Sequence, residues 1–104
     1  MPPSFHIILS PEAAADLQSL HEYISKDSPQ NAANVVGRIL DAIATLETFP
    51  HRNIVESKSR KIKDPVRSLP VKPYIVYFRV LESQQAVRIL TVRHAARRPP
   101  QRFD

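Results

Sequence analysis

The chain contains no cysteine, no tryptophan and only one glycine among its 104 residues. Without cysteine it can form neither disulfides nor thiolate metal sites, which fits a reducing cytoplasm. The single glycine, Gly37, falls inside a helical pattern, whereas the phosphate-binding loops of nucleotide enzymes need several glycines. We therefore expect a cytoplasmic protein that uses no nucleotide cofactor.

Other common signatures are missing as well. No apolar stretch approaches the roughly 18 residues of a membrane span, and residues 1–4 lack the charged and apolar regions of a signal peptide. No histidine stands three or four residues from another, as metal ligands on one helix face would. No serine is flanked by the glycines of an acyl-transfer motif. We expect no membrane insertion, no metal site and no acyl-transfer chemistry.

Charge is present, and it is unevenly arranged. Residues 1–50 hold six acidic and two basic side chains, a net charge of −4, whereas residues 51–104 hold four acidic and thirteen basic, a net charge of +9. The two values sum to the total of +5. Such a basic half attracts a polyanion, which can be nucleic acid, an acidic protein segment or an anionic membrane surface. The alternative is a solvated basic surface without a partner.

The first half predicts a strand and two helices. Alternating residues from Phe5 to Leu9 indicate the strand. Ser10–Pro11 and Ser28–Pro29 each combine a capping hydroxyl with a proline that suits the first helical position, and apolar residues then recur on one helix face. Because only Lys26–Asp27 separates the helices, we expect an antiparallel hairpin.

The second half predicts a sheet. A polar, basic loop from His51 to Asp64 is expected to hold a few apolar anchors, which are Ile54, Val55 and Ile62. The strand-like runs that follow are Val66–Val71, Tyr74–Leu81 and Ala86–His94. The middle run is apolar on both faces except Arg79, as expected of a central strand. Pro70 and Pro73 cannot donate to a sheet and mark the run before it as an edge or bulged strand.

These elements predict the fold class. We expect one α+β domain over residues 1–104, in the order β-α-α-β-β-β, with a helical hairpin packed on a mainly antiparallel four-stranded sheet. The ends, at about 1–3 and 98–104, are expected to be frayed.

Phosphoryl transfer remains open, because it asks only for cations and a proton carrier. Cleavage of RNA through its 2′-hydroxyl needs a base, an acid and fixed positive charge on the phosphate. Arg67 and Arg79 on neighbouring strands, and His94 at the end of the last strand, are candidate catalytic residues if they converge on one face. The alternative is that the arginines extend to the sheet edge and that His94 is a surface residue.

A larger set of basic residues is expected to bind a target or nucleic acid. Lysine and arginine contribute salt-dependent affinity for phosphates without reading base sequence. The same side chains can hold an acidic segment of a partner protein. The set consists of Lys58, Arg60, Lys61, Lys63, Arg93, Arg97 and Arg98.

Four stretches resemble the RelE/ParE superfamily of type II toxins, also called plasmid stabilisation proteins. They are Leu9–Leu17, Ser28–Pro50, Val66–Tyr77, and Ile89–His94 with Arg97, and they follow the family's order over nearly the whole chain. The ParE branch is the more similar, because the helical hairpin is long and because Ala95 and Ala96 follow His94, where ribonuclease members often carry a tyrosine.

The resemblance implies a toxin that inhibits growth and is neutralised by a cognate antitoxin. It also implies that the toxin–antitoxin complex binds operator DNA and represses its own promoter. ParE-like members act on DNA gyrase, which is the expected target here and requires no catalysis by the toxin. RelE-like members are endonucleases that cut mRNA on the ribosome, and Arg67 and His94 fall where some of them keep catalytic residues. A third hypothesis is a nontoxic basic binding module.

Overall fold

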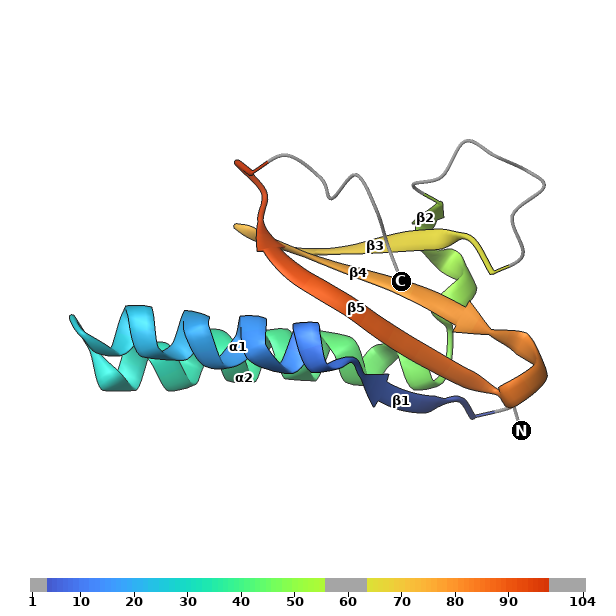
Figure 1. Cartoon of the computed structure of the whole chain (residues 1–104), viewed down its shortest axis with the longest axis horizontal. Helices are drawn as coiled ribbons and strands as arrows, with labels where there is room; N and C mark the ends of the chain where they lie inside the picture. Colours follow the sequence, from blue (N-terminus) through green and yellow to red (C-terminus); the bar gives the residue numbers. More distant parts are fainter. Residues whose placement is uncertain (1–3, 56–63, 98–104) are drawn as a thin grey trace.

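The computed structural model describes residues 4–55 and 64–97, in which two helices cover one face of a sheet (Figure 1). The elements are β1 (His6–Leu9), α1 (Pro11–Ser25), α2 (Pro29–Ala44), β2 (Ile54–Val55), β3 (Val66–Val71), β4 (Tyr74–Leu81) and β5 (Ala86–His94). Short 3-10 turns are η1 (Thr45–Glu47), η2 (Pro50–Arg52) and η3 (Glu82–Gln84). None of the described helices combines the length and the apolar character that a membrane crossing requires. The ends expected to be frayed lie outside the described residues.

The strands form one sheet in the order β1-β5-β4-β3-β2, with β1 parallel to β5 and the other neighbours antiparallel. The central strand is β4, as its apolar sequence predicts. The α+β class and the helical hairpin on a mainly antiparallel sheet are confirmed. The expected number of four strands is wrong by one, because β2 pairs with Ser68 and Arg67 and adds a short strand at the edge.

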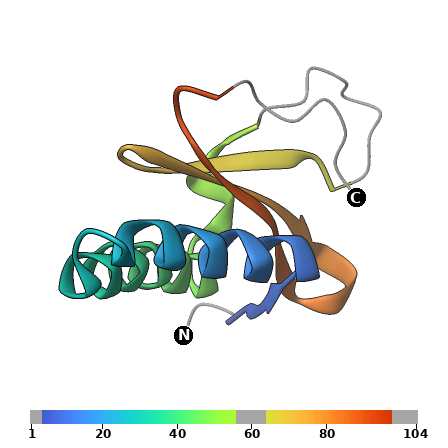
Figure 2. The same cartoon turned by 60° about the vertical axis from the view of Figure 1, so that its left-hand side comes forward.

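Each helix begins at the serine–proline pair that the sequence indicates. Ser10 Oγ accepts a hydrogen bond from Ala13 N at 3.0 Å, and Ser28 Oγ accepts one from Asn31 N at 3.1 Å. Proline follows each cap at the start of the helix, where its missing N–H has no intrahelical partner to lose. The two helices lie side by side as a hairpin in both views (Figures 1 and 2).

The main core lies between this hairpin and the sheet. Phe78 on β4 and Ile39 on α2 are fully buried there, so both layers contribute to one cluster. A smaller cluster of Val66, Tyr77 and Leu90 lies on the opposite face, which none of the described helices covers and which we call the helix-free face. The central strand is therefore buried on both faces.

Ser10 and the first helix also form hydrogen bonds with the part of β5 that lies beyond its pairing with β1. A bulge between Tyr77 and Phe78 leaves Leu90 as the extra residue of β5, and Ser10 Oγ donates to its carbonyl oxygen at 2.9 Å. Further along, one carboxylate oxygen of Asp16 accepts from Val92 N at 2.9 Å. The first helix thereby satisfies edge groups that a neighbouring strand would otherwise have to pair with.

The segment before β3 departs from the prediction. The expected loop contains β2, and its apolar residues are not anchors, because Ile54 is 71% exposed and Val55 is 39% exposed. Ile62 lies outside the described residues. A two-residue edge strand is held by backbone hydrogen bonds to its neighbour, and the pattern of apolar residues in the sequence does not predict such pairing.

Candidate functional site

The three candidate catalytic residues do not converge on one face. Arg67 on β3 pairs with Phe78 on β4, and Arg79 is the next residue along β4. Because consecutive residues of a strand point to opposite faces, Arg67 lies on the helix-covered face and Arg79 on the helix-free face. His94 pairs with Tyr74, at the other end of β4. The condition of convergence on one face is therefore not met, and a catalytic role for each residue stays a prediction.

Both arginines donate hydrogen bonds to the backbone of the segment that precedes β3. Arg67 Nη1 donates to the carbonyl oxygens of His51 and Asn53, at 3.1 Å and 2.9 Å. Arg79 Nη1 donates to the carbonyl oxygen of Asp64 at 2.6 Å. A guanidinium bound to carbonyls in this way holds a loop in place.

The helix-free face carries two arginines on neighbouring strands. Arg79 lies directly opposite Arg88 on β5, and both side chains are half-buried. Like charges directly opposite each other destabilise a sheet.

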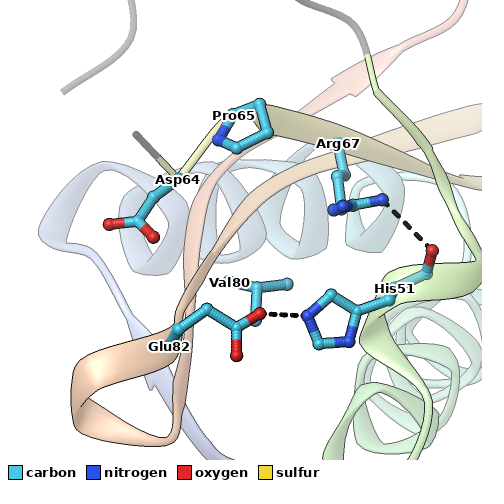
Figure 3. A pocket seen from close by; sticks show the side chains of 6 residues that line it. All are labelled: His51, Asp64, Pro65, Arg67, Val80 and Glu82. Carbon is cyan, nitrogen blue, oxygen red and sulfur yellow. Dashed lines mark hydrogen bonds and ion pairs between the residues drawn. The ribbon is translucent and has the colours of Figure 1, made fainter. Parts of the chain in front are cut away.

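A pocket of about 280 Å³ opens beside Arg67 (Figure 3), and we call it the Arg67 pocket. It is lined by His51, Asp64, Pro65, Arg67, Val80 and Glu82. His51 Nε2 and a Glu82 carboxylate oxygen form a hydrogen-bonded pair that joins η2 to η3. Two carboxylates against one arginine give a net charge of −1 with His51 neutral. The described lining residues therefore give the pocket no excess of positive charge, and its histidine–glutamate pair links two turns.

A pocket of about 220 Å³ lies at the opposite end of β4, against α1, and we call it the His94 pocket. It is lined by Asp16, Ser19, Leu20, Tyr23, Tyr74, Val92, Arg93, His94 and Arg97. The rings of Tyr74 and His94 meet edge to face, with centroids 5.5 Å apart. Three residues predicted for a site, Arg93, His94 and Arg97, come together here.

The remaining basic candidates, Lys58, Arg60, Lys61, Lys63 and Arg98, lie outside the described residues. Their predicted part in binding a target or nucleic acid stays a prediction. Within the described residues, the basic set consists of Arg93 and Arg97, and both line the His94 pocket.

A wider hollow of about 460 Å³ lies between the two helices and β1, and we call it the hairpin groove. It is lined by Leu9, Ala14, Leu17, Gln18, His21, Glu22, Val36 and Leu40. Two of its leucines are partly open to solvent, with Leu9 39% and Leu40 43% exposed. Apolar side chains left exposed around one hollow mark a surface suited to a protein partner.

Sequence reasoning missed Asp16 and Glu82 as residues that organise the sites. Asp16 bonds to Thr91, 75 positions away, and Glu82 to His51, 31 positions away, so no spacing motif reveals either contact. One signal for Asp16 was present. It stands three residues after Ala13 and within the apolar stripe of α1, where a carboxylate needs a partner.

Comparisons with known proteins agree with this architecture. Residues 7–99 match the family model described as ParE toxin of type II toxin-antitoxin system, parDE. A curated Sinorhizobium fredii protein named "Putative toxin Y4kP" is 37% identical over 87 residues, which is 82% of this chain and 82% of that protein. The chromosomal ParDE TA system from P. aeruginosa has a TM-score of 0.71 at 22% identity, covering 88% of this chain and 96% of that chain. The archaeal RelE–RelB complex from Pyrococcus horikoshii OT3 has a TM-score of 0.66 at 16% identity, covering 91% and 99%.

The two solved structures bear on the fold alone, whereas the family model and the curated relative bear on descent. The match to the family model spans nearly the whole chain, from within β1 to beyond the end of β5. The resemblance seen in the sequence is confirmed on its ParE side. The chain belongs to the ParE toxin family of type II toxin–antitoxin systems, within the RelE/ParE superfamily.

Proposed function

We propose that this toxin inhibits growth by acting on DNA gyrase. Membership of the ParE family and the separation of Arg67, Arg79 and His94, which weighs against a catalytic site built from these three residues, support the proposal. An RNA endonuclease needs a base, an acid and a cation within reach of one phosphate. Here the two arginines lie on opposite faces, and the histidine lies at the other end of β4. A toxin that acts by binding a protein target needs no such assembly.

We further propose that a cognate antitoxin neutralises the toxin by covering the hairpin groove. The solved relatives are a ParDE system and a RelE–RelB complex. An amphipathic helix can place its apolar residues in a groove of this kind, and Leu9 and Leu40 provide exposed apolar contacts. The hairpin, residues 11–44, carries five acidic and two basic side chains, a net charge of −3. A basic antitoxin helix would therefore fit it best.

Induction of the chain in growing bacteria tests the target. We expect plasmid DNA to lose negative supercoils within minutes while the incorporation of labelled amino acids continues. Co-expression of the protein encoded beside the toxin gene should restore supercoiling. Rapid arrest of translation with normal supercoiling would contradict the gyrase proposal, and harmless induction without the antitoxin would favour a nontoxic binding module.

Two substitutions separate the gyrase hypothesis from the endonuclease hypothesis. His94→Ala and Arg67→Lys remove the proton carrier and the arginine, while lysine at position 67 keeps the charge. Toxicity should survive both changes if the toxin acts by binding. Loss of toxicity in both, with antitoxin binding unchanged, would support RNA cleavage instead.

A further inference from the structure

The two pockets at opposite ends of β4 differ in the sign of their charge. The described residues that line the Arg67 pocket have a net charge of −1, whereas those that line the His94 pocket, Arg93 and Arg97 with Asp16, have a net charge of +1, counting both histidines as neutral. The single carboxylate of the His94 pocket is already engaged, because one of its oxygens accepts from Thr91 Oγ1 at 2.5 Å and from Val92 N at 2.9 Å. Counted over the described lining residues of the two pockets, the His94 pocket is the one whose net charge favours an anion.

The turn that forms one wall of the His94 pocket is held in place. Ala95 N donates to the Pro73 carbonyl oxygen at 2.8 Å, and Arg97 N donates to the His94 carbonyl oxygen at 3.0 Å. Ala96 N donates to Nδ1 of His94 at 3.0 Å. Since Nδ1 accepts this bond, the proton of the neutral ring belongs on Nε2, which leaves an N–H donor available to a ligand. A donor fixed in advance loses little entropy when it binds.

Aromatic rings complete the pocket. Tyr74 packs its ring against His94, and Tyr23 on α1 is 73% exposed at the pocket lining. Proteins that bind single-stranded nucleic acids stack the bases on exposed aromatic rings and hold the phosphates with nearby basic side chains. Tyr23 beside the arginines of this pocket matches that arrangement. The pocket volume of about 220 Å³ is below the roughly 300–1,000 Å³ that encloses drug-sized ligands. It therefore suits one small unit that remains partly open to solvent.

We propose that the His94 pocket binds a single nucleotide, either free or as one unit of a single-stranded nucleic acid. The phosphate lies against Arg97 and the Nε2–H of His94, and the base stacks on Tyr23. This inference goes beyond the proposed function, because it concerns a ligand bound by the toxin alone. It needs neither gyrase nor the antitoxin to be tested.

Binding to the purified full-length chain tests the proposal with four probes, which are inorganic phosphate, thymidine monophosphate, and short single-stranded oligonucleotides of DNA and of RNA. We expect the nucleotide and the oligonucleotides to bind, with NMR shifts at the rings of His94, Tyr74 and Tyr23. Tyr23→Ala should weaken oligonucleotide binding by roughly fivefold or more, because base stacking is lost. Arg97→Ala should reduce the slope of log affinity against log salt by about 0.7 for a single strand.

Arg52→Ala is the matched control, since it removes the same charge from an exposed residue on η2 whose guanidinium lies 5.0 Å from the centroid of the Phe49 ring. It should change affinity less than twofold. Equal losses in Arg52→Ala and Arg97→Ala would overturn the proposal, because they would indicate nonspecific attraction. The proposal would also be overturned if phosphate bound as tightly as the nucleotide and Tyr23→Ala left oligonucleotide affinity unchanged. Absence of binding by every probe at low salt would overturn it as well. Preference for DNA or RNA among the oligonucleotides identifies the source of the nucleotide.

Discussion

The helical hairpin and the strand layer of this toxin differ in the sign of their charge. Residues 11–44 carry a net charge of −3, whereas residues 66–94 hold five basic and one acidic side chain, a net charge of +4. The hairpin borders an apolar groove, and the end of the strand layer borders a small cationic pocket. One domain of this size can therefore offer a protein partner and an anion separate surfaces.

Substitution of the shared core should have the largest effect, because both layers depend on it. Phe78→Ala on β4 removes a fully buried ring and should lower the free energy of unfolding by about 3–5 kcal/mol. Urea denaturation measures this change. Leu40→Ala, at a position 43% exposed in the hairpin groove, is the control and should cost about 1 kcal/mol or less while weakening antitoxin binding. Equal losses for the two variants would show that the groove is part of the core.

The contact between the two layers at Asp16 should come next. Asp16→Ala leaves Thr91 Oγ1 and Val92 N without their acceptor and should destabilise the fold by about 1–3 kcal/mol. Hydrogen exchange should become faster at Val92 than at central β4 amides. Asp41→Ala, an exposed acidic residue on α2, removes the same charge and should leave both measurements nearly unchanged. Similar effects from the two variants would attribute the stability to charge instead of these bonds.

Gly37→Ala should have a smaller effect of the opposite sign. A Cβ at this helical position meets no atom within 4 Å, so alanine should raise the free energy of unfolding by about 0.5–1 kcal/mol through its higher helix propensity. Thermal denaturation of the purified chain provides the measurement. If stability rises while antitoxin affinity falls, the glycine serves close approach of the partner on the hairpin. A lower melting temperature would contradict the open space at this position.

The smallest effect is expected at the pair formed by His51 and Glu82. The two side chains are 48% and 56% exposed, and exposed pairs are typically worth about 0–1 kcal/mol. Glu82→Gln should therefore cost less than Asp16→Ala, although both remove a bonded carboxylate. Comparison of the two unfolding curves at low and high salt checks this order. A larger loss for Glu82→Gln would mean that the Arg67 pocket matters more to the fold than its exposure suggests.

Much of this fold can be predicted from local sequence. The serine–proline pairs mark the helix starts, and the apolar runs give β3, β4 and β5 with the bounds that the structure shows. These features are encoded by neighbouring residues, through capping and side-chain alternation. Edge pairing by β2 and the bulge at Leu90 are set by contacts between distant segments, and no local pattern contains them.

The candidate site was harder to predict, although part of the answer was available. Only Lys72 and Pro73 separate the second and third predicted strands, so Val71 must pair with Tyr74. Counting along that register places Arg67 opposite Phe78 and therefore on the other face from Arg79. The grouping of Arg93, His94 and Arg97 with α1 depends on how the helix packs, which register alone does not give.

Titration of purified gyrase with the purified toxin tests the central claim most directly, with a translating ribosome and a labelled mRNA assayed in parallel. A toxin that acts by binding should abolish supercoiling as its concentration approaches that of gyrase, and it should leave the mRNA intact. Cleavage of the mRNA by toxin present in far smaller amounts, with supercoiling undiminished, would contradict the account.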